Sequence, residues 1–301
     1  MGLPPPLLGT TTLWHAHEMI TGFGGACMAA YFLTALHNWT GGRPVTGHTL
    51  ALLVALWAGA RVALAFDETA PLACGIAPGI AFYGLFAIIY ARAVWQGRRW
   101  GWLFLPGVIA ALGVFDALFV AAARGAVSLP DSIVMTRVLV LFFAIKVSIV
   151  AGGMTPRFTG NWIRLSGMGR LPVSRPLATR VGLGPMLLAM GLTFGGAWRA
   201  ASLALILAGG VQLWRMWGWR SLTARRYAPA LMLHLAFAWV PLGLVLTGLA
   251  GLFRLPWQET DAIHALMMGA MAGLAMSIAL RARAAPGRCC ACRPFRWQAT
   301  G

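Results

Sequence analysis

Apolar residues dominate the chain in long runs, and the breaks between these runs are short and contain charged residues, proline or glycine. A helix needs roughly 20 predominantly apolar residues to cross the hydrocarbon core of a bilayer. Runs of that length predict an all-α fold, a polytopic transmembrane helical bundle with about nine helices. The predicted helices cover residues 14–36, 47–66, 75–95, 101–123, 132–152, 177–197, 199–217, 228–250 and 260–281.

The composition supports a membrane protein, because 59% of the residues are apolar and only 10% are charged. That balance leaves too little polar surface to cover a soluble globule of this size. We expect residues 1–281 to form a single transmembrane domain. Residues 282–301 form a basic tail with Cys289, Cys290 and Cys292 but no packing pattern, and we expect the tail to be unstructured or frame-shifted.

The distribution of arginine predicts the orientation, because cytoplasmic loops carry an excess of Lys and Arg. With the N-terminus outside and the C-terminus cytoplasmic, the outer loops hold little more than Arg124, Arg199 and Arg254. The net charge of +17 then follows from topology and contact with anionic membrane lipid, and it requires no nucleic-acid partner. The inner loops and tail hold Arg43, Arg92, Arg98, Arg99, Arg157, Arg164, Arg170, Arg175, Arg220, Arg225, Arg226, Arg288, Arg293 and Arg296.

A short set of ionisable residues lies within the predicted helices, where charge is costly and often functional. By the predicted topology seven of them share the outer half of the membrane, whereas Lys146 and His234 lie in the inner half. Asp116 and Glu18 are available to neutralise Arg61 or Arg137, although both arginines are also placed to snorkel outward. The full set is His15, His17, Glu18, Arg61, Asp116, Arg137, Lys146, His234 and His264.

The histidines are the candidate metal ligands, because neutral imidazole is a common ligand for haem iron and copper. His15 and His17 stand two residues apart, which is about 200° around a regular helix. Either His15 and Glu18 share one face while His17 points elsewhere, or the helix begins irregularly. The segment is not a zinc-protease motif, which needs histidines four residues apart with glutamate after the first.

Several segments together resemble the NnrS family, bacterial membrane proteins that contain haem and copper and are linked to nitric oxide. The HAHEM and NWTG segments are the most specific, and the similar segments follow the same order along the chain. They are residues 13–23 (LWHAHEMITGF), 32–35 (FLTA), 38–41 (NWTG), 152–161 (GGMTPRFTGN), 214–220 (WRMWGWR), 233–239 (LHLAFAW) and 263–266 (IHAL).

The resemblance implies helices bundled around haem and copper, with His15, His17, His234 and His264 as candidate ligands. It also makes Arg61, Arg137 and Arg157 candidate partners for haem propionates, since guanidinium pairs well with carboxylate. Family members resemble bundles of about twelve helices, so we expect helices before the HAHEM segment and after residue 281 to be missing here. The tail also departs from the family pattern and removes one further histidine.

The resemblance therefore implies a multi-pass protein of the bacterial inner membrane that acts in nitric oxide response or nitrosative-stress protection, associated with denitrification. Nitric oxide or a nitrosyl species is the expected ligand, and whether the protein turns it over is left open. Two alternatives stand beside this interpretation. One is a non-enzymatic nitric oxide sensor or accessory protein, and the other is a membrane transporter that uses the intramembrane His, Arg and Asp residues.

Overall fold

The computed structural model describes residues 8–66, 69–127, 132–167, 169–173 and 176–283. Throughout these ranges the regular structure is helical, with no strand, and nine helices are long and apolar enough to cross a membrane. The predicted all-α polytopic bundle is confirmed. The spans are Thr11–His37, Gly47–Leu64, Leu72–Gln96, Trp100–Ala123, Ile133–Ser166, Leu177–Phe194, Trp198–Trp217, Ala228–Leu252 and Glu259–Leu280.

Eight of the nine spans agree with the predicted runs to within a few residues, whereas the fifth continues to Ser166 instead of ending near residue 152. Gly152, Gly153 and Pro156 interrupt the apolar run there, yet all three lie inside the helix. An apolar run measures the length that lipid covers, and a helix can continue beyond that length with polar side chains. The predicted loop over residues 153–176 is therefore wrong for its first half.

The chain divides into two compact units, Met1–Leu139 and Val140–Gly301, with the boundary inside the fifth span. The predictions of one domain over residues 1–281 and of an external N-terminus stay predictions. Most of the predicted tail, residues 284–301, lies outside the described residues.

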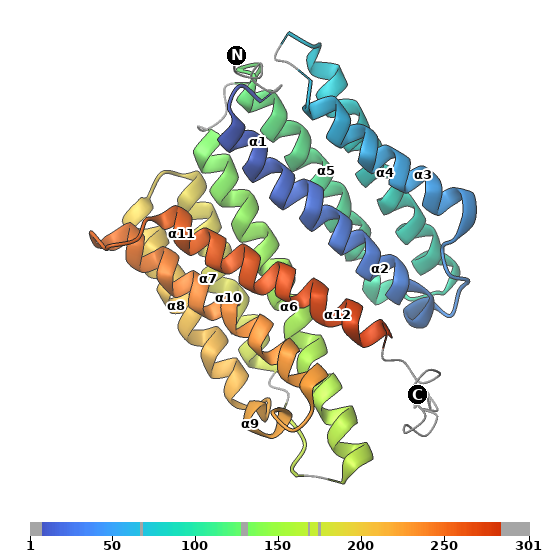
Figure 1. The fold of residues 1–301 in the computed structure, drawn as a ribbon, viewed down its shortest axis with the longest axis vertical. Helices are drawn as coiled ribbons and strands as arrows, with labels where there is room; N and C mark the ends of the chain where they lie inside the picture. The colour runs from blue at the N-terminus through green and yellow to red at the C-terminus, as the bar shows by residue number, and fades with distance from the viewer. Residues whose placement is uncertain (1–7, 67–68, 128–131, 168, 174–175, 284–301) are drawn as a thin grey trace. The chain divides into compact units, whose positions relative to one another are not determined.

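The first unit contains the N-terminal helices and the beginning of α6 (Ser132–Ser166) (Figure 1). Helix α4 packs against α2, α3 and α5. One buried apolar cluster joins Leu64 of α3, Phe119 and Val120 of α5 and Met135 of α6. The elements are α1 (Thr11–His17), η1 (Glu18–Phe23), α2 (Gly24–Thr40), α3 (Gly47–Leu64), α4 (Leu72–Gln96), η2 (Trp100–Trp102) and α5 (Phe104–Ala123).

The second unit is organised around α10, which packs against α8 and against the last helical segments. Glycines permit this close packing, since an added Cβ at Gly248 would lie 2.6 Å from the Ser202 carbonyl oxygen of α8. Besides the rest of α6, the elements are α7 (Pro176–Phe194), α8 (Trp198–Trp217), α9 (Ser221–Ala224), α10 (Ala228–Leu252), α11 (Glu259–His264), η3 (Ala265–Ala272) and α12 (Gly273–Arg283).

Two π-helical segments interrupt the first and the last span, and each begins directly after a histidine. Segment η1 follows His17 and connects α1 to α2, and η3 follows His264 and connects α11 to α12. The π-helix is rare because its wider turn pairs residues five apart, and it occurs frequently at functional sites. His15 and His17 themselves lie in the regular α-helix α1, and the irregular segment begins at the next residue, Glu18.

Candidate functional site

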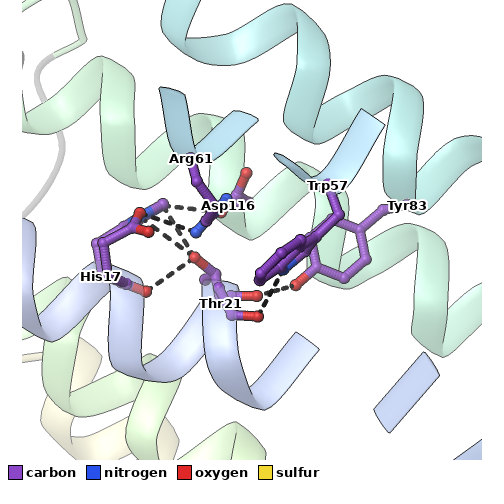
Figure 2. A network of polar contacts seen from close by, with 8 residues as sticks. His17, Thr21, Trp57, Arg61, Tyr83 and Asp116 are labelled. Atoms are coloured by element: carbon purple, nitrogen blue, oxygen red, sulfur yellow. Dashed lines mark hydrogen bonds and ion pairs between the residues drawn. The ribbon is translucent and has the colours of Figure 1, made fainter. Parts of the chain in front are cut away.

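A buried polar network surrounds His17 in the first unit (Figure 2). The imidazole is fully buried, and its Nε2 lies 2.8 Å from Oδ1 of Asp116, which is 1% exposed. Its Nδ1 lies 3.2 Å from Oε1 of Glu18. Both ring nitrogens therefore have a carboxylate partner, one from α5 and one from the first residue of η1.

Arg61 completes the charge balance of this network. Its Nη1 donates to Oε1 of Glu18 at 2.8 Å, the same oxygen that contacts His17. Two carboxylates and one guanidinium sum to −1, so a protonated His17 would make the cluster neutral. Buried charges are tolerated when they are paired and hydrogen-bonded, and these four groups satisfy that condition together.

The side chains around η1 also hold its backbone. Tyr83 donates from its hydroxyl to the Thr21 carbonyl at 3.0 Å, and Trp57 donates from Nε1 to the Gly22 carbonyl at 2.9 Å. The Thr21 hydroxyl donates to the His17 carbonyl at 2.9 Å and lies 3.1 Å from His17 Nε2. The π-helical segment is thus part of the network (Figure 2).

Two glycines make room for the charged side chains. A Cβ added at Gly79 of α4 would lie 2.3 Å from Oδ2 of Asp116, and one added at Gly22 would lie 2.5 Å from Nη1 of Arg61. Distances below 3.0 Å are essentially never seen for real Cβ atoms. Glycine at these positions therefore allows a carboxylate and a guanidinium to lie directly against neighbouring helix backbones.

A second buried histidine, His234 of α10, has a different environment in the second unit. It is 2% exposed, with Nε2 2.8 Å from the Thr159 hydroxyl of α6 and Nδ1 2.9 Å from the Ser221 hydroxyl of α9. The Trp219 ring lies edge-on to the imidazole at 6.1 Å. Hydroxyls donate or accept, so this imidazole can remain neutral in either tautomer.

The other two predicted histidine ligands are exposed. His15 and His17 have opposite environments, as the angle of about 200° predicts. His264 ends α11, and its Nδ1 lies 2.8 Å from the Thr260 carbonyl oxygen of the preceding turn. The four predicted ligands thus comprise a buried and an exposed histidine in each unit.

The predicted arginines also differ in environment. Arg61 forms the ion pair with Glu18 that the sequence allowed, and Arg137 is half-buried in α6. Arg157 is exposed and lines a pocket with Arg215, which is 4% exposed. Arg215 belongs to the family-like segment 214–220 but is not among the predicted site residues.

Neutral polar partners were missed by the sequence reasoning, which considered only ionisable groups inside the membrane. Thr21, Tyr83, Thr159 and Ser221 all contact a buried histidine or the backbone around it. The available signal was the i to i+4 spacing of His17 and Thr21, which places both on one side of a helical turn.

The described residues contain no group of three or more His, Cys, Asp and Glu side chains that could hold a metal ion. The set of four histidines is therefore not assembled within either unit. His17 fits a metal poorly, because carboxylates face both of its nitrogens. His234 fits a single-histidine attachment better, since one hydroxyl can turn away while the other continues to orient the ring.

A family model described as NnrS protein matches residues 2–288 of the chain. No curated protein and no solved structure matches it.

Proposed function

Because this chain belongs to the NnrS family, we propose that it is a bacterial inner-membrane protein that binds haem and copper and handles nitric oxide or nitrosyl species. The nine candidate membrane spans among its described residues make it a multi-pass membrane protein. Protection against nitrosative stress, in association with denitrification, is the role that the resemblance favours. The observation that carries the haem part of this proposal is the environment of His234.

His234 has the features expected of a histidine that would hold haem iron. The imidazole is buried, and its two hydrogen-bond partners are hydroxyls that carry no charge. Metal ligation requires a neutral imidazole with one free nitrogen, and the second nitrogen is normally held by a hydrogen bond. Thr159 or Ser221 would hold that second nitrogen and fix the direction of the ring.

Haem bound at this position would supply an iron atom as the coordination site for nitric oxide. The residues of the chain would contribute a nitrogen ligand from His234, the orientation of its ring and the exclusion of water. Trp219 is 1% exposed and packs against Phe237 with ring centroids 4.7 Å apart, so buried aromatic rings lie beside His234. The copper part of the proposal rests on the family resemblance, because the described residues assemble no three-ligand centre.

The network around His17 favours a second function, proton transfer through the first unit. Exposure increases from Asp116 at 1% to the side chain of Glu18 at 12%, and both carboxylates contact His17, while the Arg61 guanidinium keeps its charge beside Glu18. Such a series can move a proton between a buried carboxylate and the exterior. This function would be tested by recording proton uptake into vesicles that contain the protein and its Asp116→Asn variant.

The haem proposal is tested by purifying the full chain in detergent and recording its optical spectrum together with its iron and copper content. We expect a haem absorption band in the wild type and its loss in His234→Ala. The matched control is His48→Ala, because His48 is exposed near the beginning of α3. The absence of haem from the wild type would overturn the proposed function. A band that survives His234→Ala would overturn only the ligand assignment.

The same preparation separates turnover from binding. Steady consumption of nitric oxide in the presence of a reductant would favour an enzyme, whereas uptake that stops at one equivalent per haem would favour a sensor. A wild-type protein whose haem spectrum does not change with nitric oxide would exclude both.

A further inference from the structure

A pocket of about 560 Å³ lies in the second unit, between the end of α6, the beginning of α7 and the end of α8. Four arginines line it: Arg157, Arg164, Arg180 and Arg215. Its volume falls in the range of about 300–1,000 Å³ that is usual for small-molecule sites. Apolar residues, among them Ile149, Leu171 and Trp219, complete the lining.

In the described part of the chain none of the four arginines forms an ion pair. Only two acidic residues, Glu259 and Asp261, occur after residue 139. Both lie in α11, at the opposite end of α10 from α9 (Figure 1). The pocket therefore presents an excess of positive charge that an anion would neutralise.

The backbone of α6 holds the Arg215 guanidinium in position at the pocket. Its Nη1 donates to the Ser148 carbonyl at 2.8 Å, and the side chain is 4% exposed. A Cβ added at Gly152 would lie 2.3 Å from Nη1 and 2.5 Å from Nη2. Glycine at position 152 thus lets the guanidinium lie flat against α6, with part of it lining the pocket.

The pocket lies at the level of a membrane surface. Arg180 is in the second turn of α7, and Arg215 is in the last turn of α8, so both stand at the ends of candidate spans. Helix α6 has 35 residues, or about 52 Å at 1.5 Å per residue, and exceeds a hydrocarbon core of about 30 Å. Trp214 and Trp217 nearby are exposed, as expected for an interfacial aromatic belt.

We propose that this pocket binds the phosphate group of an anionic membrane phospholipid. Guanidinium groups recognise phosphate through paired hydrogen bonds, and basic pockets between membrane helices bind anionic headgroups. The apolar lining would contact the glycerol and the first carbons of the acyl chains. The proposal does not depend on haem, because it uses only the arginines, the glycine and the position at the end of the spans.

The test uses the full chain, purified and depleted of lipid, with native mass spectrometry to count bound lipids and to measure affinity. The probes are phosphatidylglycerol, phosphatidylcholine and inorganic phosphate. We expect one phosphatidylglycerol to remain bound where phosphatidylcholine does not, and inorganic phosphate to compete poorly.

Two variants examine the pocket without removing the buried Arg215. In Arg157→Gln/Arg180→Gln both altered side chains are exposed, and the loss of two charges should weaken phosphatidylglycerol binding about 30-fold. Gly152→Ala keeps every charge but displaces the Arg215 guanidinium, and it should weaken binding several-fold. The matched controls are Arg199→Gln at the other end of α8 and Gly210→Ala, where an added Cβ meets nothing within 4 Å.

Each other outcome overturns the proposal. Equal binding of phosphatidylglycerol and phosphatidylcholine would exclude a headgroup site for anionic lipid. Full competition by inorganic phosphate would make the pocket a site for a soluble anion. Loss of haem from the pocket variants with unchanged lipid binding would make it a propionate site. Unchanged lipid affinity in both variants would place the lipid elsewhere.

Discussion

Each unit buries a histidine within a candidate membrane span, but the side chains that contact the two imidazoles differ in charge. In the first unit His17 lies between two carboxylates, and a guanidinium balances them. In the second unit His234 lies between two hydroxyls, and no acidic residue occurs between residue 140 and Glu259. The first arrangement stabilises charge on the imidazole, whereas the second is compatible with a neutral ring.

The difference extends to the arginines of each unit. The charge of Arg61 is neutralised by its ion pair with Glu18. In the second unit four arginines line one pocket whose described lining contains no carboxylate: Arg157, Arg164, Arg180 and Arg215. In the first unit the charges around His17 can therefore be balanced by residues of the same unit. The second unit contains both of the proposed ligand sites, haem at His234 and an anionic lipid at the four arginines.

The largest effect that would break this comparison is expected from Asp116→Ala. This substitution removes the carboxylate that contacts Nε2 of the buried His17. Truncation of one member of a buried pair lowers the free energy of unfolding by about 3–5 kcal/mol. The measurement is thermal unfolding of the protein in detergent. Asp116→Asn is the companion variant, because it removes the charge but keeps a side chain of the same size. Unchanged stability in both would show that the His17 network is not energetically important.

A smaller effect is expected when the same carboxylate is displaced and not removed. Gly79→Ala places a Cβ 2.3 Å from Oδ2 of Asp116, and overpacking of this kind costs about 1–3 kcal/mol. Gly84→Ala in the same helix is the control, since its Cβ meets nothing within 4 Å. Unfolding midpoints that respond equally to the two alanines would contradict the close contact with Asp116.

An effect no larger than that of Gly79→Ala should come from the hydroxyls around His234. Thr159→Val leaves one imidazole nitrogen without its partner, which costs about 1–3 kcal/mol and less than removing a buried charge partner. The control is Thr247→Val, because the Thr247 hydroxyl bonds only to the Gly243 carbonyl of its own helix. A loss for Thr159→Val as large as for Asp116→Ala would mean that the two histidines have equivalent environments.

The sequence was sufficient to locate the spans, because apolar length is a local property that each segment carries by itself. It also separated His15 from His17 by helix geometry alone, and their different exposure agrees with that separation. The helix over residues 153–166 was missed, since Gly153 and Pro156 look like breaks but are accommodated inside α6.

The partners of the buried histidines could not be predicted in the same way. His17 and Asp116 are 99 residues apart, so their contact depends on how α1 and α5 pack. Thr159 and Ser221 are ordinary residues in sequence and become important only because α6 and α9 bring them to His234. Arg215 is one of many arginines near helix ends in the sequence, and its burial depends on Gly152 of another helix.

The π-helical segment after His17 has a consequence for how this region tolerates change in length. A π turn holds one more residue than an α turn, and one residue corresponds to about 100° of rotation around a helix. Deleting one residue from Glu18–Phe23 would convert η1 to α-helix and rotate everything before it, which would turn His17 away from Asp116. The extra residue of η1 therefore sets the rotation of α1 about the helix axis. That rotation determines which side chain of the HAHEM segment enters the protein interior.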